Sequence, residues 1–225
     1  NSMDALTSGG CNVAIGIDAL GKATDNLQNV AIGEGAMSCT SADGDKNIGI
    51  GYFALGGSLV TGASNIAIGT YAADALTTGY NNIGLGNWSG DALTTGTNNI
   101  AIGQLSLSAS TDGADNIAIG RSAFAVSAAT ADNNVAIGLS AMGGCLVTGA
   151  SNVAIGTNAA DALLGGACNI AMGQDALGAA TIGLCNIAIG KGAMSGVTTG
   201  AANDNVAIGT GALLGAAGTT GDDNI

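Results

Sequence analysis

A pair of aliphatic residues separated by one small residue recurs along the chain, each time between an asparagine and a glycine. The motif is NIAIG at residues 99–103 and again at 116–120. We number each repeat from its asparagine as position 0, so that the glycine is at +4 and preceding residues have negative numbers. Complete copies recur every 17 to 19 residues and begin at Asn12, Asn29, Asn47, Asn65, Asn82, Asn99, Asn116, Asn134, Asn152, Asn169, Asn186 and Asn205. A further copy begins at Asn224 and is cut off.

Alternation within the motif predicts one short β-strand per repeat. Positions +1 and +3 are nearly always Ile or Val, and residues two apart in a strand point to the same side of a sheet. A strand this short cannot bury a face alone, so we expect successive repeats to stack as coils of an all-β parallel β-solenoid. At 4.7–4.9 Å per strand, twelve coils would form a rod roughly 55–60 Å long.

We expect the aliphatic residues at +1 and +3 to face inward and form a dry interior on which the stacking depends. Each would contribute on the order of 1.5–3 kcal/mol. Position +2 would then face outward. It is Ala in ten copies and Gly49 or Gly84 in the others, and this small size indicates close packing against either another chain or a second layer of the same coil. The first alternative predicts self-association.

The asparagine that begins each repeat has two structural explanations. Stacked at the same point of every coil, its amide would donate to one neighbouring coil and accept from another, forming an Asn ladder. Alternatively, it is a turn residue that tolerates left-handed backbone geometry.

The pattern NIAIGxxAL…TTGxxNIAIG, illustrated by residues 65–86, resembles the head repeats of trimeric autotransporter adhesins, and similar repeats occur in phage tail fibres. The resemblance implies a left-handed parallel β-roll, three chains wound about one axis, and attachment of an exposed surface to a host or matrix. This chain has longer coils than is usual in those heads, and its sequence contains no coiled-coil stalk or membrane anchor.

Composition narrows the class of protein. A uniform repeat indicates a single domain over residues 1–225, which we expect to be a segment of a longer repetitive chain. The net charge of −12 argues against binding to nucleic acid or anionic membranes, because both need a basic surface. No apolar run reaches the 18 residues of a membrane span, so we expect no membrane insertion in this segment.

The residue inventory offers little for catalysis. The chain has no His, which removes the commonest general base, and its Ser and Cys residues have no evident activating partner. We therefore expect no enzyme activity and no cofactor. Paired acidic residues at three corners would supply oxygen ligands for Ca²⁺ but do not recur in every coil, which favours solvated turns: Asp43 and Asp45, Asp112 and Asp115, Asp222 and Asp223.

Two of the five cysteines occupy the same place in adjacent repeats. Cys168 and Cys185 both precede the repeat asparagine, so stacking would bring them within disulfide range. A bridge would indicate an oxidising, extracellular setting, and two free thiols are the alternative. Cys11 occupies the same position far along the chain, whereas Cys39 and Cys145 fall elsewhere in their repeats.

Aromatic residues are scarce but aligned. Position +6 is Phe53, Tyr71, Trp88 and then Leu105 in successive copies, which predicts a vertical stripe on the solenoid. The stripe is a candidate surface for a glycan or a host-surface protein, and its alternatives are a stacking ladder or packing against a sister chain. Asn87 begins an Asn-Trp-Ser glycosylation sequon.

The leading hypothesis is a structural and adhesive extracellular segment of a surface adhesin, a virion fibre or a secreted filament, with self-association as a homotrimer or filament. The first alternative is a filament subunit whose coils stack end to end. A less favoured alternative is an ice-binding solenoid, because six copies place Thr at position −4 and the other copies interrupt the row. That row contains Thr61, Thr78, Thr95, Thr130, Thr148 and Thr220, and the other copies have Asp25, Asp43, Asp112, Gly165, Ile182 and Ala201 at this position.

Overall fold

Twelve three-residue strands form the regular secondary structure of the described part of the chain. The computed structural model describes residues 1–40, 44–126, 131–179, 182–196 and 202–215, and this part of the chain contains no helix. Every strand covers positions +1 to +3 of a repeat, as predicted. The strands are β1 (Val13–Ile15), β2 (Val30–Ile32), β3 (Ile48–Ile50), β4 (Ile66–Ile68), β5 (Ile83–Leu85), β6 (Ile100–Ile102), β7 (Ile117–Ile119), β8 (Val135–Ile137), β9 (Val153–Ile155), β10 (Ile170–Met172), β11 (Ile187–Ile189) and β12 (Val206–Ile208).

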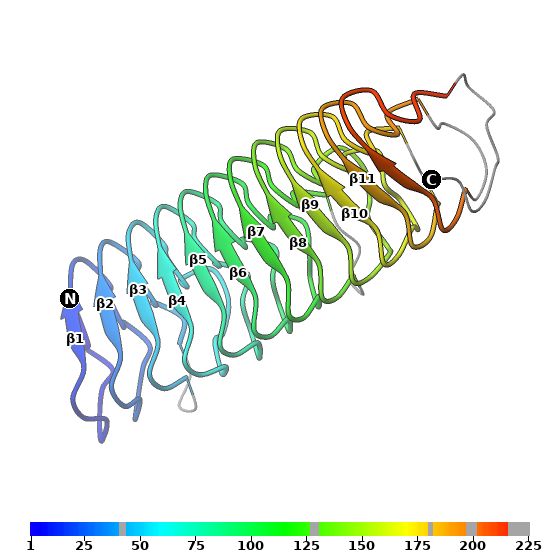
Figure 1. Ribbon diagram of the computed structural model, residues 1–225. Helices are drawn as coiled ribbons and strands as arrows, with labels where there is room; N and C mark the ends of the chain where they lie inside the picture. The colour runs from blue at the N-terminus through cyan, green and yellow to red at the C-terminus, as the bar shows by residue number, and fades with distance from the viewer. Residues whose placement is uncertain (41–43, 127–130, 180–181, 197–201, 216–225) are drawn as a thin grey trace. The chain divides into compact units, whose positions relative to one another are not determined.

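The strands pair in parallel and in sequence order, one strand per coil (Figure 1). Contacts divide the chain into two compact units, Asn1–Ala114 and Asp115–Ile225. In the first unit β1 to β6 pair consecutively, and in the second β7 to β12 do so. The register joins equivalent repeat positions, so that Ile66 pairs with Ile83 and Ile170 with Ile187. Each unit is therefore a parallel β-solenoid, which confirms the predicted fold class.

The strand side chains face the opposite way from the sequence prediction, with position +2 and not positions +1 and +3 turned toward the interior. The middle residue of the strand points into the coil and is buried in β2 to β12 and half-buried in β1, whereas the aliphatic residues at +1 and +3 are half-buried or exposed. Ile15 is 59% exposed and Ile208 is 67% exposed. We call the surface formed by positions +1 and +3 the strand face of each unit. Alternation correctly placed these residues on one side, but the assignment of that side to the interior was wrong.

The narrow interior of a coil explains the reversed orientation. Opposite the middle strand residue lies position +7, which is also small and buried, for example Ala36 and Ala54. Even a methyl group added at Gly49 would come within 2.8 Å of Met37 Cγ, so an isoleucine could not fit at this level. The small residues therefore face the second layer of their own coil, which was one of the two alternatives offered by the sequence. Stacking does not depend on an aliphatic strand interior.

Each coil core holds about one large side chain, contributed by either of two positions. In every 17-residue coil in which both positions are described, a large residue at +8 accompanies a small one at +11, or the reverse. The pairs, all buried, are Leu20 and Ala23, Ala73 and Leu76, Gly90 and Leu93, Leu107 and Ser110, and Ala160 and Leu163. A Cβ added to Gly90 would lie 3.0 Å from Leu93 Cδ1, so the two positions share one space. The combined side-chain volume at +8 and +11 is thus similar in each of these coils.

The repeat asparagines form the predicted ladder. The side-chain oxygen of Asn82 accepts a bond from the backbone N–H of Asn99 at 3.0 Å, and its Nδ2 donates to the Gly96 carbonyl at 2.7 Å. Nδ2 also donates to Oδ1 of the preceding Asn65 at 3.1 Å. Equivalent bonds recur in both units, and the repeat asparagines that the structure describes are all buried except the half-buried Asn12. Buried amides are thereby satisfied without water.

Left-handed backbone geometry belongs to the residues around the asparagine rather than to the asparagine itself. Non-glycine residues with φ near +60° precede it in every repeat, for example Asn81 at +57° and Cys168 at +60°. The competing explanation of the asparagine as a left-handed turn residue is therefore wrong. The glycine at +4 has a different constraint, since at Gly33 φ is +132° and an added Cβ would lie 2.5 Å from the Gly51 carbonyl oxygen. Only glycine permits this close stacking of corners.

Candidate functional site

The aromatic residues at position +6 form a stacked column in the first unit. The ring centroids of Phe53 and Tyr71 are 5.9 Å apart with an interplanar angle of 24°, and those of Tyr71 and Trp88 are 6.3 Å apart at 9°. Tyr52 packs edge-on against Phe53 and Tyr71, with centroids at 4.9 Å and 5.4 Å. The vertical stripe predicted from the sequence is therefore present, and we call it the aromatic column.

Packing within the column limits what it presents to a ligand. Both faces of the Tyr71 ring are occupied by its neighbours, so mainly ring edges are open to solvent. Trp88 is 39% exposed and Tyr52 42%. Leu105 continues the row, because its N–H donates to the Asn87 carbonyl of the preceding coil at 3.1 Å. The stacking supports the ladder explanation of the stripe, and binding of a partner to its exposed edges stays a prediction.

Two carboxylates lie at position +9 beside the column. Burial raises the pKa of Asp91 to about 6, with a further contribution from the charge of Asp74 in the preceding coil. Burial also raises the pKa of Asp74. Asp91 Oδ1 is buried and accepts no hydrogen bond. The Tyr52 hydroxyl is the main cause of the raised pKa of Tyr71, and the charge of Asp74 contributes, which places this carboxylate near the column. The sequence signal was the recurrence of Asp at +9 in two successive copies.

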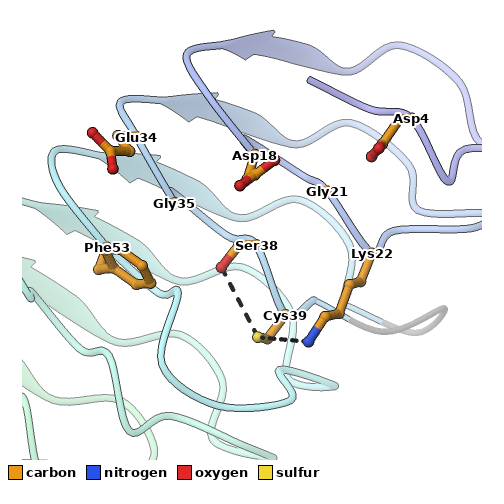
Figure 2. Close-up of a pocket in the computed structure, with 9 residues that line it drawn as sticks. All are labelled: Asp4, Asp18, Gly21, Lys22, Glu34, Gly35, Ser38, Cys39 and Phe53. Atoms are coloured by element: carbon orange, nitrogen blue, oxygen red, sulfur yellow. Dashed lines mark hydrogen bonds between the residues drawn. The ribbon is translucent and has the colours of Figure 1, made fainter. Parts of the chain in front are cut away.

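A pocket of about 420 Å³ opens where the +6 row lacks a side chain. Gly35 occupies that place between Asp18 and Phe53, and the Phe53 ring leans over it (Figure 2). A Cβ at Gly35 would lie 2.8 Å from the ring. The lining residues are Asp4, Asp18, Gly21, Lys22, Glu34, Gly35, Ser38, Cys39 and Phe53. Sequence reasoning missed this pocket, because one glycine in a stripe gives no signal until the coils are stacked.

Three of the four charged residues that line the pocket are acidic. Lys22 Nζ donates to Cys39 Sγ at 3.6 Å, and the Ser38 hydroxyl lies 3.9 Å from the same sulfur (Figure 2). The carboxylates of Asp18 and Glu34 line other sides of the pocket. These groups are suited to binding hydroxyls or amines by hydrogen bonds.

The structure places Cys168 and Cys185 over one another in adjacent coils of the second unit. The N–H of Cys185 donates to the Ala167 carbonyl at 3.0 Å, which aligns the two residues. Both are exposed free thiols. Burial raises the pKa of Cys185, and the neighbouring Cys168 thiol adds to this effect. The predicted proximity is confirmed, while a disulfide between them stays a prediction. Cys11, at the equivalent position in the first unit, is also an exposed thiol.

The glycosylation sequon lies in a corner of its coil. Asn87 is exposed, and its side-chain oxygen accepts a bond from the Thr70 N–H at 3.3 Å. Ser89 is buried, and its hydroxyl donates to the Gly86 carbonyl at 2.9 Å. Glycosylation of Asn87 stays a prediction.

The threonine row at −4 is stacked but interrupted. Thr78, Thr95 and Thr148 are exposed, and Asp112 occupies the row in the first unit. In the second unit Gly165 lies between Thr148 and Ile182, since a Cβ added to this glycine would be 3.6 Å from Thr148 Oγ1 and 3.7 Å from Ile182 Cγ2. The other predicted members Thr130, Thr220, Asp43 and Ala201 lie outside the described residues.

The paired acidic residues lie only partly within the described ranges. Asp112 and Asp115 are exposed, whereas Asp43, Asp222 and Asp223 lie outside the described residues. Across the described ranges no three His, Cys, Asp or Glu side chains gather as metal ligands. A search of the same residues finds no helix of sufficient length and apolarity to cross a bilayer.

Comparison with known proteins finds no relative of this chain. The chain matches no protein-family model, no curated protein and no solved structure.

Proposed function

We propose that the protein is a structural and adhesive segment of an extracellular fibre, carried on a cell or virion surface or in a secreted filament, and that its copies associate through the strand face. The observation that carries this proposal is the composition of that face. All its residues are Ile, Val, Leu or Met, and none is charged. Val13 is 44% exposed, Ile68 39% and Met172 38%. Proteins that act alone rarely leave such a continuous apolar surface in water.

A second copy of the same chain is the partner that fits this surface best. The aliphatic side chains recur at the spacing of the strands, about 4.7–4.9 Å, so a matching row must have the same repeat. An identical sheet has that repeat by construction, and two such faces can interdigitate as a dry interface between sheets. Three copies around one axis would cover all three faces, in keeping with the homotrimer implied by the resemblance to adhesin heads.

The adhesive part of the proposal is assigned to the aromatic column and the adjoining carboxylates. The exposed edges of Tyr52 and Trp88 and the carboxylates of Asp74 and Asp91 combine apolar and hydrogen-bonding groups. A glycan or a polar loop of a host-surface protein has matching chemistry. These residues lie on the turns and not on the strand face, so self-association would leave them free.

Sedimentation velocity over a range of concentrations tests the association. We expect the wild-type chain to form a defined oligomer and the double variant Ile68→Lys/Ile102→Lys to sediment as a monomer with an unchanged circular dichroism spectrum. The control is Leu59→Lys/Leu105→Lys, which adds the same charge at exposed apolar positions away from the strand face. It should keep the wild-type oligomer.

A wild-type chain that stays monomeric at all concentrations, or an equal effect of both double variants, would exclude the strand face as the interface. Electron microscopy of the native assembly then distinguishes a short bundle of chains from a continuous fibre built by end-to-end stacking. Binding of the wild-type oligomer to a glycan array, compared with Tyr52→Ala, tests the adhesive role separately.

A further inference from the structure

The stacked cysteines of the second unit suggest a binding site in addition to the surfaces described above. We propose that Cys168 and Cys185 form a two-thiolate site for a soft monovalent metal ion of the Cu(I) or Ag(I) class. The site is independent of the strand face and of the aromatic column.

The two cysteines have the same backbone conformation in consecutive coils. Their φ angles are +60° and +56°, and each N–H donates to the residue at −2 of the preceding coil, at 3.1 Å for Cys168 and 3.0 Å for Cys185. The strands that follow them pair in register, Ile170 with Ile187. Equal backbone conformations in stacked coils direct the Cα–Cβ bonds in parallel. The two thiols therefore leave the surface side by side, one strand spacing apart.

That spacing suits a bridging ion better than a direct sulfur–sulfur bond. Parallel bonds keep the two Cβ atoms at about the strand separation of 4.7–4.9 Å, whereas a disulfide needs about 3.5–4.5 Å. The coils cannot easily close this gap, because the adjacent Asn186 N–H bonds to Asn169 Oδ1 at 2.9 Å and fixes the spacing. Two metal–sulfur bonds of about 2.3 Å in line span about 4.6 Å.

The number and kind of ligands select the class of ion. Thiolates favour soft ions such as Cu(I) and Zn(II), and a structural zinc site needs four ligands in tetrahedral geometry. No three His, Cys, Asp or Glu side chains gather as metal ligands among the residues that the structure describes, and Asp204, at −1 of the next coil, acts on Cys185 through its charge, which contributes to the raised pKa of that thiol. Cu(I) and Ag(I) bind two thiolates in a linear arrangement. Binding converts two thiols and one monovalent cation into an anionic bis-thiolate complex and two released protons, so charge and atoms balance.

Cys11 provides an internal comparison. It occupies position −1 with φ of +60°, but the residue stacked over it at −1 of the next coil is Gln28, also with φ of +60°. Gln28 donates its N–H to the Gly10 carbonyl at 3.1 Å, so the alignment is the same as at the cysteine pair. Cys11 should therefore bind the ion weakly in the wild type. The substitution Gln28→Cys should create a second site.

Titration of the reduced full-length chain with Ag(I), followed by native mass spectrometry, tests the site. Excess 2-mercaptoethanol in the buffer competes for the ion with single protein thiols, so that a two-thiolate site is distinguished from a lone cysteine. We expect one tightly held ion in the wild type, and an affinity at least about tenfold lower, or about 1.4 kcal/mol, in Cys168→Ser and in Cys185→Ser. Cys11→Ser and Cys145→Ser should behave as wild type, and Gln28→Cys should hold two ions. Because Cys168 and Cys185 are exposed, their serine variants should fold as the wild type does, and circular dichroism checks this.

Two results at the cysteine pair itself would overturn the proposal. One is retention of the full stoichiometry in both Cys168→Ser and Cys185→Ser. The other is isolation of the chain with these two sulfurs already bonded to one another, lighter by two hydrogen atoms and resistant to alkylation. Failure of Gln28→Cys to add a second ion would show that stacking at −1 does not create the site, and would count equally against the geometric argument.

Discussion

Exchanging Ala73 and Leu76 tests whether a coil core holds one large side chain at either of two positions. Both residues are buried, with Leu76 fully inaccessible. Leu76→Ala alone leaves a cavity and should destabilise the first unit by about 2–5 kcal/mol. Ala73→Leu alone inserts a second large side chain beside Leu76 and should cost about 1–3 kcal/mol through overpacking.

The double variant Ala73→Leu/Leu76→Ala should recover most of this loss. It reproduces the arrangement of Leu20 and Ala23 and places the new leucine next to Leu55, the +8 residue of the preceding coil. The total volume is conserved, and left-handed geometry at +8 is compatible with leucine, since φ is +53° at Leu55 and +48° at Ala73. We expect a net cost below about 1.5 kcal/mol. The two substitutions should thus be coupled by at least about 1.5 kcal/mol.

Urea denaturation monitored by tryptophan fluorescence measures these free energies. Trp88 is the only tryptophan and stacks on Tyr71 in the coil that contains both mutated residues, so it reports on their surroundings. The argument is refuted if the cost of the double variant equals the sum of the two single costs. A cost of Leu76→Ala below about 1 kcal/mol would likewise show that the interior is not tightly packed.

Three further predictions concern polar groups. The Ser110 hydroxyl is buried without a hydrogen-bond partner, so Ser110→Ala should stabilise the first unit by about 1 kcal/mol in thermal or urea unfolding. The control Ser106→Ala removes a 2.9 Å hydrogen bond to the Gly103 carbonyl and should not stabilise the unit. Asp91 has a folded pKa of about 6, above its unfolded value, so the stability of the wild type should rise as pH falls from 6 toward 4. Asp91→Asn should stabilise the first unit at pH 7 by on the order of 1 kcal/mol after allowance for solvent screening. This advantage over the wild type should disappear near pH 4. Asn82→Ala should cost about 2–4 kcal/mol by calorimetry because it leaves buried partners unsatisfied, and Asn81→Ala, at an exposed position, should cost less than half as much.

The repeat spacing was enough to predict the strands, their parallel stacking and the Asn ladder. The period-two alternation also placed Ile66 and Ile68 on one side of the sheet. It failed to say which side, because hydrophobicity alone ignores the space available inside a coil. The persistent alanine at +2 was the stronger signal, since a narrow interior selects for small size before it selects for apolar area.

Surface features were predictable only where they follow a single repeat position. The aromatic column and the stacked cysteines each occupy one such position, so alignment of the copies revealed them. The pocket at Gly35 involves several positions in neighbouring coils, and the carboxylates of Asp74 and Asp91 share position +9 but owe their raised pKa values mainly to burial. Their properties depend on burial and on the direction of side chains at corners, which a one-dimensional alignment does not contain.

The asparagine ladder has a direction along the chain. The side chain of Asn82 bonds to backbone groups of the following coil only, at Asn99 and Gly96, and its bond to the preceding coil runs back to the Asn65 side chain. During synthesis from the N-terminus, each coil would therefore be locked only when the next one has emerged and wrapped beneath it. Growth of this kind is vectorial: a nascent chain always carries one incomplete rung at its leading end, and every earlier rung is already closed.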